Sequence, residues 1–269
     1  MSSAATDLFS REGYYIFRSV YSKEEIAACR NNLVSIFLNE TKDKGDIEKH
    51  ERYGSIKFDF FNRYESLRPL IFHPKAIQSL RAVLGNKIII LPESAAHHNG
   101  FGNWHKDTDA QEHDGVDFHW QDKENFRMIQ CAIYLQPNDK IYGGGLDVIP
   151  GSHLAPPPFS KYFQPGFTTK VARLLGLRPK PVTLPSEAGD FVVFDLRLDH
   201  KATASQKFPI PEDKQKYALF FIATNSAAQA EHYLAYIKTR KDYLYLHNYS
   251  YQPSLLDLAK RCEVELASV

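Results

Sequence analysis

The feature that most constrains the fold of this chain is a succession of short β-branched and aromatic runs beyond residue 86. Runs of about four to eight such residues, bounded by turn residues, are typical of β-strands. Stretches rich in Gly, Pro and Asn separate these runs, and many short strands joined in this way are typical of an antiparallel barrel or jelly roll. The predicted strands lie at residues 87–91, 128–135, 145–149, 190–195 and 217–223.

Two helices are predicted ahead of this β region. Ser22 and Glu25 have the spacing of a capping box, which predicts a helix that continues to about residue 39. A second helix is predicted over residues 73–84, because Gly85 follows its last apolar position and is suited to end it.

Two further N-terminal stretches contribute to the expected fold class. Residues 12–17 are aromatic and β-branched and predict a strand, whereas the highly charged residues 40–57 predict an exposed, mobile connection. The sequence therefore indicates a mainly β protein with flanking helices (α+β).

A single domain is expected over residues 1–269, because no internal repeat or low-complexity linker divides the sequence. We expect an N-terminal helical part over about residues 1–85, a β core over about 86–226, and a tyrosine-rich C-terminal segment over 227–269.

The C-terminal segment allows two interpretations. Six tyrosines gather between residues 233 and 251, together with Lys238, Arg240 and Lys241. Such a segment can pack as a helix on the outside of the β core. Alternatively, tyrosines beside basic residues suit contact with a membrane interface, a large glycan or a lipid-linked substrate.

Composition excludes several classes of protein. The 33 Lys and Arg residues nearly balance 32 Asp and Glu residues, and a net charge of +1 argues against a nucleic-acid binder. No apolar run approaches the ~18 residues of a membrane-spanning helix.

The first residues lack the features of a secretory signal, so a cytoplasmic location is expected. The three cysteines form no CxxC pair and predict neither a disulfide framework nor a zinc site.

The clearest chemical pattern is the pair His105 and Asp107. Two residues apart on an extended segment, their side chains point the same way. His200, at the end of a predicted strand, could complete a set of two histidines and one carboxylate. Such a set binds non-haem Fe(II) and leaves positions open for other ligands. Taken alone, this spacing is a weak signal.

Four segments resemble, in order, the phytanoyl-CoA dioxygenase-like family. Trp104 to Asp107 resembles its WHxD motif, and the Gly-Gly-Leu-Asp-Val-Ile-Pro-Gly-Ser-His sequence of residues 144–153 resembles its central signature. Residues 9–26 resemble its opening, and residues 189–195, leading to His200, resemble its distal-histidine strand. The resemblance covers roughly residues 8–226.

This resemblance implies a double-stranded β-helix (jelly roll or cupin-like) core and oxygenase chemistry. It assigns His105, Asp107 and His200 as catalytic ligands of Fe(II), with 2-oxoglutarate as the cosubstrate and O2 as the oxidant. Succinate and CO2 would be released as a C–H bond is hydroxylated. Related halogenases lack the carboxylate ligand, so the retained Asp107 favours hydroxylation.

The expected site for the 2-oxoglutarate C5 carboxylate departs from the family pattern. Members usually provide an arginine on the strand after the distal histidine, but residues 211–220 contain none. Lys216 matches the expected position best, although an ammonium lacks the planar fork of a guanidinium. Lys214 and Arg197 are the alternatives.

Three polar residues are weaker candidates for cosubstrate contact. The hydroxyls of Thr203 or Ser205 could assist the carboxylate, and Gln130 could reach the cosubstrate from its strand. Ordinary strand polarity is the preferred explanation of Gln130, and cosubstrate contact is the weaker alternative.

Three other histidines lie in or near the segments that resemble the family. His153 ends the central signature, where the family has a structural turn, so it is not expected to bind metal. His97 and His98 lie just upstream of His105, and one of them is expected either to contact substrate or to serve as a hydrogen-bonded structural residue.

Three functions remain open from the sequence. The first is a dioxygenase that hydroxylates a small metabolite, a glycan or a lipid-linked molecule, with specificity from residues 97–102, the polar insertion 109–125 and the tyrosine-rich segment. The second is a degenerate relative that binds metal or ligand without turnover, which the missing arginine favours and the retained triad opposes. The third is an interaction domain that uses the tyrosine-rich segment.

Overall fold

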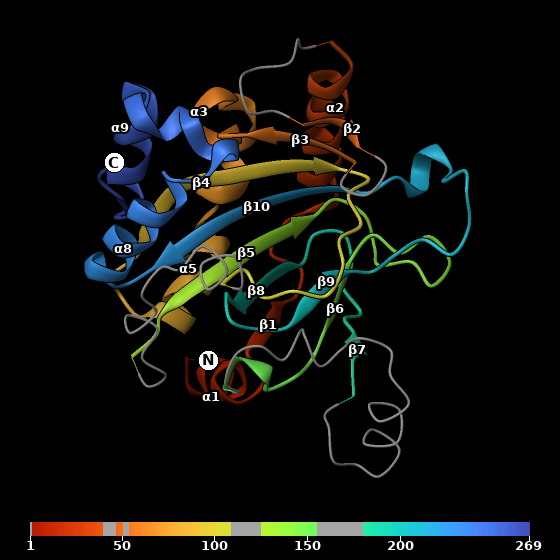
Figure 1. The fold of residues 1–269 in the computed structure, drawn as a ribbon, viewed down its shortest axis with the longest axis horizontal. Coiled ribbons are helices and arrows are strands. Elements are labelled where there is room, and N and C mark those ends of the chain that lie inside the picture. Colours follow the sequence, from red (N-terminus) through yellow and green to blue (C-terminus); the bar gives the residue numbers. More distant parts are fainter. Residues whose placement is uncertain (1, 40–46, 51–53, 109–124, 155–179) are drawn as a thin grey trace.

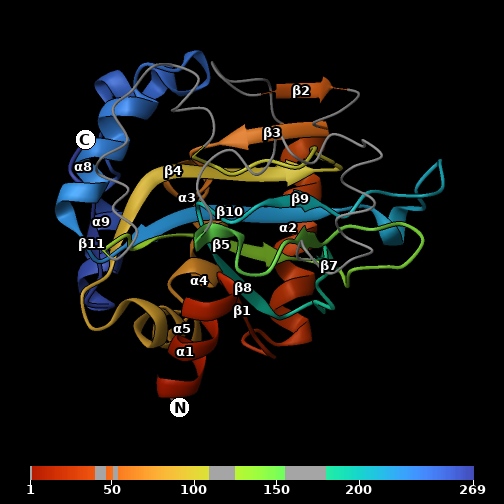
Figure 2. The ribbon, with the colours of Figure 1, turned by 60° about the horizontal axis from the view of Figure 1, so that its bottom comes forward.

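A computed structural model describes residues 2–39, 47–50, 54–108, 125–154 and 180–269 (Figure 1). Two sheets form its core. The larger has the strand order β1-β8-β5-β10-β4-β3-β2, and β11 pairs in parallel with β4; the smaller has the order β7-β6-β9. Figure 2 shows the larger sheet as a stack of strands, with β9 of the smaller sheet in front of it. Two facing antiparallel sheets are the expected jelly-roll core.

The predicted runs at 12–17, 128–135, 145–149, 190–195 and 217–223 correspond to β1, β5, β6, β8 and β10, whereas the run at 87–91 is only the first part of a longer strand, β4, and five short strands among the described residues were not predicted. The strands of the larger sheet are β1 (Tyr14–Phe17), β2 (Ile47–His50), β3 (Gly54–Phe58), β4 (Ile89–His98), β5 (Met128–Tyr134), β8 (Phe191–Asp195), β10 (Tyr217–Thr224) and β11 (Glu265–Leu266). Those of the smaller sheet are β6 (Leu146–Val148), β7 (Val182–Thr183) and β9 (His200–Ala202).

Helices pack around this core, chiefly at its two ends and behind the larger sheet (Figures 1 and 2). No described helix is long and apolar enough to cross a membrane. The α-helices are α1 (Ser2–Glu12), α2 (Lys23–Asn39), α3 (Phe60–Arg63), α4 (Arg68–Ile71), α5 (Pro74–Leu84), α8 (Ala227–Ile237) and α9 (Pro253–Arg261).

Local capping explains where the two predicted helices begin and end. The Ser22 amide donates to the Glu25 carboxylate at 2.8 Å, and the Glu25 amide donates to the Ser22 hydroxyl at 3.1 Å, so the capping box is confirmed. The His73 side chain accepts from the Lys75 amide at the start of α5, and Gly85 ends that helix with a φ of 84°.

The two faces of the larger sheet have different roles. On β5, Ile129, Cys131 and Ile133 join the apolar core that also contains residues of α2. Gln130 and Tyr134 alternate with them and therefore face the other side, toward the smaller sheet. The space between the two sheets thus receives side chains from both.

The expectation of an exposed connection over residues 40–57 is wrong at its C-terminal end. Residues 54–58 form β3, and Ile56, Lys57 and Phe58 are all buried. The strand β3 was not predicted because the residues around it are highly charged, but it pairs in register with β4. Residues 40–46 and 51–53 lie outside the described residues.

The tyrosine-rich segment packs inward. Tyr233, Tyr236 and Tyr243 are all less than 9% exposed and belong to an apolar cluster with strands β3 and β4. The Tyr249 hydroxyl donates to Asp59 at 2.8 Å. These contacts support packing on the β core and leave the predicted membrane or glycan surface without support.

Candidate functional site

The predicted metal ligands converge at one edge of the smaller sheet. His105 and His200 pair as a β-bridge, with backbone hydrogen bonds of 3.0 and 2.9 Å in the two directions. Their rings lie 4.3 Å apart, centroid to centroid. One carboxylate oxygen of Asp107 lies 3.6 Å from the Nε2 atom of each histidine. One ligand atom from each of the three residues lies within 4.8 Å of the others, as a shared metal ion requires.

Backbone carbonyls orient both imidazoles for metal binding. Nδ1 of His105 lies 2.7 Å from the Asn103 carbonyl, and Nδ1 of His200 lies 2.9 Å from the Leu198 carbonyl. A carbonyl can only accept, so each Nδ1 donates its hydrogen and each Nε2 keeps the lone pair that a metal needs. The donor set of two imidazoles and a carboxylate therefore fits a divalent transition metal such as Fe(II).

The carboxylate ligand is held in its ionised form. Burial by itself would raise the pKa of Asp107, but His200, His105 and Arg240 outweigh that effect, and its pKa is lowered from the ordinary value. Asp107 is thus prepared to supply negative charge to a cation.

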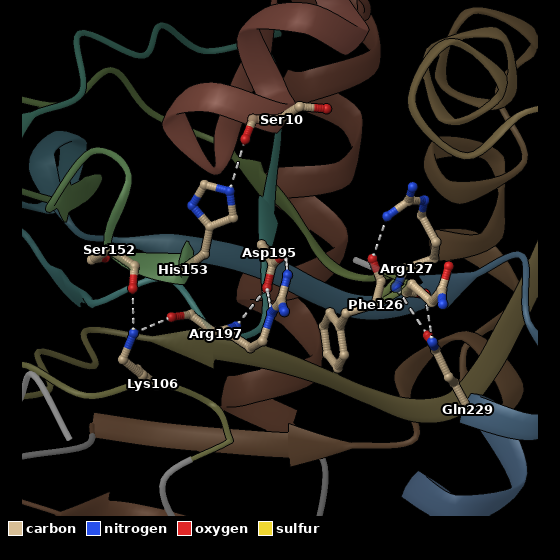
Figure 3. Close-up of polar contacts among 10 residues, drawn as sticks. Ser10, Lys106, Phe126, Arg127, Ser152, His153, Asp195, Arg197 and Gln229 are labelled. Carbon is tan, nitrogen blue, oxygen red and sulfur yellow. Dashed lines mark hydrogen bonds and ion pairs between the residues drawn. The ribbon is translucent and has the colours of Figure 1, made fainter. Parts of the chain in front are cut away.

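A buried polar network, here called the polar frame, joins the segments that carry these ligands, and Figure 3 shows its contacts among Lys106, Ser152 and Arg197. The Lys106 ammonium donates to the carbonyls of Ser152 at 2.8 Å and Arg197 at 2.5 Å, and lies 3.4 Å from an Asp199 carboxylate oxygen. The Asp199 amide in turn donates to the Ser152 hydroxyl at 2.8 Å. Lys106 stands between two metal ligands and Asp199 precedes the third, so the polar frame joins both ligand-bearing segments.

A cavity of about 470 Å³ opens beside the triad, within the usual range of small-molecule sites. One end is lined by Lys216, Tyr134, His97, Phe101 and Phe220, and the other by Phe58, Glu93, Arg240 and Tyr243. Ile56 also lines the cavity and lies opposite His97 in the β3–β4 pairing.

The strand register separates these two ends. The Asn99 amide donates to the Lys216 carbonyl, and Glu93 stands six residues back along the same strand, about 20 Å at the usual rise of a strand. Burial is the main cause of the raised pKa of both Tyr134 and Glu93, and the charge of Asp107 adds to it. The triad, which also lines the cavity, therefore lies within reach of both ends.

Lys216 presents a buried ammonium at its end of the cavity. Its Nζ donates to the Gly100 carbonyl at 2.9 Å and lies within 6 Å of the ring centroids of Phe101, Tyr134 and Phe220. Burial lowers the pKa of Lys216 to about 7. The buried Tyr134 hydroxyl has no hydrogen-bond partner among the described residues. A carboxylate is the group that would satisfy both donors.

Of two other residues predicted to contact the cosubstrate, Gln130 lines the cavity and Arg197 does not. Gln130 lines the cavity from β5, as expected of a contact residue. Arg197 is instead held by Asp195, through hydrogen bonds of 2.9 and 2.8 Å, and its guanidinium stacks over the Phe126 ring (Figure 3). The cavity lining does not include Arg197.

The remaining alternatives also have partners elsewhere. The Thr203 hydroxyl donates to Asp147 at 2.8 Å and accepts from the Asn138 amide at 3.0 Å. The Ser205 hydroxyl donates to the Lys207 carbonyl, and the Lys214 ammonium lies 3.5 Å from an Asp139 carboxylate. Among the basic candidates, Lys216 is the one that lines the cavity.

The three other histidines differ in environment. His97 lines the cavity, and burial together with Lys216 lowers its pKa to about 3, so it is neutral. His98 points to the opposite face, where its ring stacks on Tyr217 at 4.5 Å. His153 lies in a short helical turn and its Nε2 is 3.1 Å from the Ser10 carbonyl (Figure 3), as expected of a structural histidine.

Sequence reasoning named the tyrosine-rich segment, which contains Arg240, as a source of specificity, but it missed Glu93 and its contact with Tyr243. The Tyr243 hydroxyl donates to Glu93 at 2.5 Å, although 150 residues separate them. No motif or spacing joins these positions, so only the fold brings them together. The predicted insertion 109–125 lies outside the described residues except for its last position.

Comparison with known proteins identifies relatives by sequence and by fold. The family model described as "Phytanoyl-CoA dioxygenase (PhyH)" matches residues 9–208. No curated protein matches the chain.

Solved structures of non-haem iron enzymes share the fold. EctD from S. alaskensis, crystallised with 2-oxoglutarate and 5-hydroxyectoine, has a TM-score of 0.62 at 17% identity, over 83% of this chain and 76% of its own. The epimerase SnoN from nogalamycin biosynthesis, crystallised with Fe3+ and α-ketoglutarate, has a TM-score of 0.60 at 16% identity, over 83% of each chain. The carbocyclase SnoK has a TM-score of 0.61 at 18% identity, over 84% of each chain. At these identities the likeness shows the jelly-roll fold.

Proposed function

Since this chain belongs to the phytanoyl-CoA dioxygenase family, we propose that it is an Fe(II)- and 2-oxoglutarate-dependent dioxygenase that hydroxylates a C–H bond of a small molecule. The observation that carries the proposal is the orientation of the triad. Both Nδ1 atoms are bonded to carbonyls, and both Nε2 atoms lie 3.6 Å from the same Asp107 oxygen.

His105, Asp107 and His200 would hold the metal. Fe(II) bound by this donor set keeps positions open for a 2-oxo acid and for O2, and supplies the oxidising chemistry. EctD and SnoN, crystallised with iron or 2-oxoglutarate, support the same two cofactors here. All three residues line the cavity, so a metal held by them would be accessible from it.

Lys216 and Tyr134 would hold the C5 carboxylate of 2-oxoglutarate. A carboxylate can accept at once from the Lys216 ammonium and from the Tyr134 hydroxyl, which has no partner within the part of the chain that the structure describes. The three aromatic rings around Nζ exclude water and favour a charged ammonium when the anion is bound. Gln130 would contribute a further hydrogen bond from the cavity wall.

A small molecule is the substrate class that the cavity supports. Its volume of about 470 Å³ must accommodate the cosubstrate as well as the substrate. The inward packing of the tyrosine-rich segment gives no support to a lipid-linked substrate.

The proposal is tested by succinate release from 2-oxoglutarate. The Fe(II)-loaded protein should release succinate, and Asp107→Ala should lower the rate by at least about a hundredfold because it removes the anionic ligand. The matched control is Asp257→Ala, which removes an exposed carboxylate on α9 and should leave the rate unchanged. Equal rates in wild type and a folded Asp107→Ala protein would show that the triad is not the metal site.

Hydroxylation is distinguished from other oxidations by isotope labelling. A metabolite extract treated with the enzyme under 18O2 should yield a product that has gained one labelled oxygen atom. A product without added oxygen would indicate a reaction such as the epimerisation named for SnoN. Absence of both succinate and product would favour a degenerate binding relative.

A further inference from the structure

Arg240 lies at the end of the cavity away from Lys216. It follows α8 and immediately precedes the helical stretch Lys241–Asn248. Its side chain lines the cavity together with Ile56, Phe58 and Glu93. The proposed use of the Lys216 end by 2-oxoglutarate leaves this end for the primary substrate.

The Arg240 guanidinium has spare hydrogen-bonding capacity. A guanidinium carries five N–H donors, yet that of Arg240 makes no hydrogen bond among the described residues. Its ion-pair partner is Asp242, at 3.8 Å. The Asp242 side chain is 51% exposed, and exposed pairs at such a distance contribute little.

Arg240 is nevertheless held in place. Its guanidinium lies over the Tyr243 ring, 5.3 Å from the centroid. Tyr243 is buried, and its hydroxyl donates to Glu93 at 2.5 Å. Because the Tyr243 ring already restricts the Arg240 guanidinium, that side chain loses little conformational entropy when it binds a ligand.

Arg240 lies close enough to the metal ligand Asp107 to interact with it electrostatically. Its charge reaches Asp107 and contributes to the lowered pKa of that carboxyl. The Phe58 ring packs against Tyr243, 5.4 Å between centroids, and with Ile56 provides an apolar wall of the cavity. A ligand with an anionic group on Arg240 and an apolar body on this wall would therefore extend toward the triad.

We propose that Arg240 binds an anionic group, a carboxylate or a phosphate, of the primary substrate. This inference rests on the proposed function, because it assumes that 2-oxoglutarate occupies the Lys216 end. It makes the substrate a small organic acid or phosphate ester with an apolar portion. Arg240 is then a specificity-determining residue.

Three probes with the same aromatic body test the charge requirement. Benzoate, phenyl phosphate and benzamide are titrated by ligand-observed NMR into protein loaded anaerobically with Fe(II) and saturating 2-oxoglutarate. At least one anion should bind about tenfold to a hundredfold more tightly than neutral benzamide. A preference for benzoate indicates a carboxylate substrate, and a preference for phenyl phosphate indicates a phosphate ester.

Variants distinguish the contribution of Arg240 to anion binding from that of the protein's overall charge. Arg240→Gln should abolish the preference for the anion, Arg240→Lys should keep part of it, and the exposed Arg261→Gln on α9 should keep all of it. Equal binding of all three probes to wild type, or an unchanged preference in Arg240→Gln, would overturn the assignment. So would an Arg240→Gln protein whose defect is weaker 2-oxoglutarate binding.

The two proposals fail in different experiments. A wild-type protein that releases no succinate contradicts the proposed function. Intact succinate release without any anion preference contradicts only the role of Arg240.

Discussion

At the scale of the residue, the site combines ligands that a local pattern reveals with partners that only the fold reveals. His105 and Asp107 are two positions apart, a weak signal by itself, and the family resemblance assigned His200 as the third ligand of the triad. Arg240 and Glu93 have no such spacing, because their segments meet across 150 residues of chain at Tyr243. Lys216 was predicted as the best match, but Lys214 and Arg197 stayed open as alternatives because the sequence does not show which of the three side chains lines the cavity.

Lys216 should make 2-oxoglutarate binding depend on pH. Its folded-state pKa is about 7, so it is charged below that pH and neutral above it. The dianion binds the charged form, and above pH 7 binding must take up a proton. The 2-oxoglutarate Kd, measured by anaerobic titration, should therefore rise between pH 7 and 9, by at most about tenfold per unit.

Substitutions at this position should change the profile in distinct ways. Lys216→Arg keeps its charge at every pH and should flatten the profile, whereas Lys216→Met should bind weakly throughout. Lys214→Met is the matched control, because that lysine pairs with Asp139 at the surface, and it should behave as wild type. An unchanged Kd in Lys216→Met would remove this residue from the cosubstrate site.

At the scale of the element, local chemistry fixed some boundaries and tertiary pairing fixed others. The reciprocal Ser22 and Glu25 bonds start α2 where the capping box predicts. By contrast, β3 was missed because its charged surroundings resemble a loop, and it becomes a strand through its pairing with β4. The two segments that carry the metal ligands are joined by the buried pair of Lys106 and Asp199.

A double-mutant cycle should measure how strongly that pair joins the segments. Breaking a buried ion pair costs about 3–5 kcal/mol, so Lys106→Met and Asp199→Asn should each destabilise the protein to that extent. The double variant should lose less than the sum of the two, with a coupling of about 1–3 kcal/mol. Denaturant unfolding gives these values, and metal titration should show weaker affinity in both single variants.

An exposed ion pair provides the control for this cycle. The Lys87 ammonium lies 3.7 Å from Glu265, and both side chains are about half exposed or more. Lys87→Met should cost less than about 1 kcal/mol. Additive losses at Lys106 and Asp199 would mean that the pair does not join the two segments.

At the scale of the whole molecule, the C-terminal segment is bound to the N-terminal part. The buried Arg68 guanidinium donates to Gln252 at 2.6 Å and to Ser254 at 2.8 Å, and Tyr249 donates to Asp59. A single domain over residues 1–269 stays a prediction, which these long-range bonds support. The short-strand pattern predicted the jelly roll, but it could not show that the tyrosines pack inward, because a polar hydroxyl suits a buried hydrogen bond as well as a surface.

The central claim is that one site binds Fe(II) and 2-oxoglutarate together. The most direct measurement is the visible charge-transfer absorption that arises when a 2-oxo acid chelates Fe(II), recorded anaerobically without any primary substrate. Wild-type protein should develop this absorption on addition of both components, and a folded Asp107→Ala/His200→Ala double variant should not. Absence of the band from wild type, or an equal band in the double variant, would contradict the assignment of His105, Asp107 and His200 as the iron site.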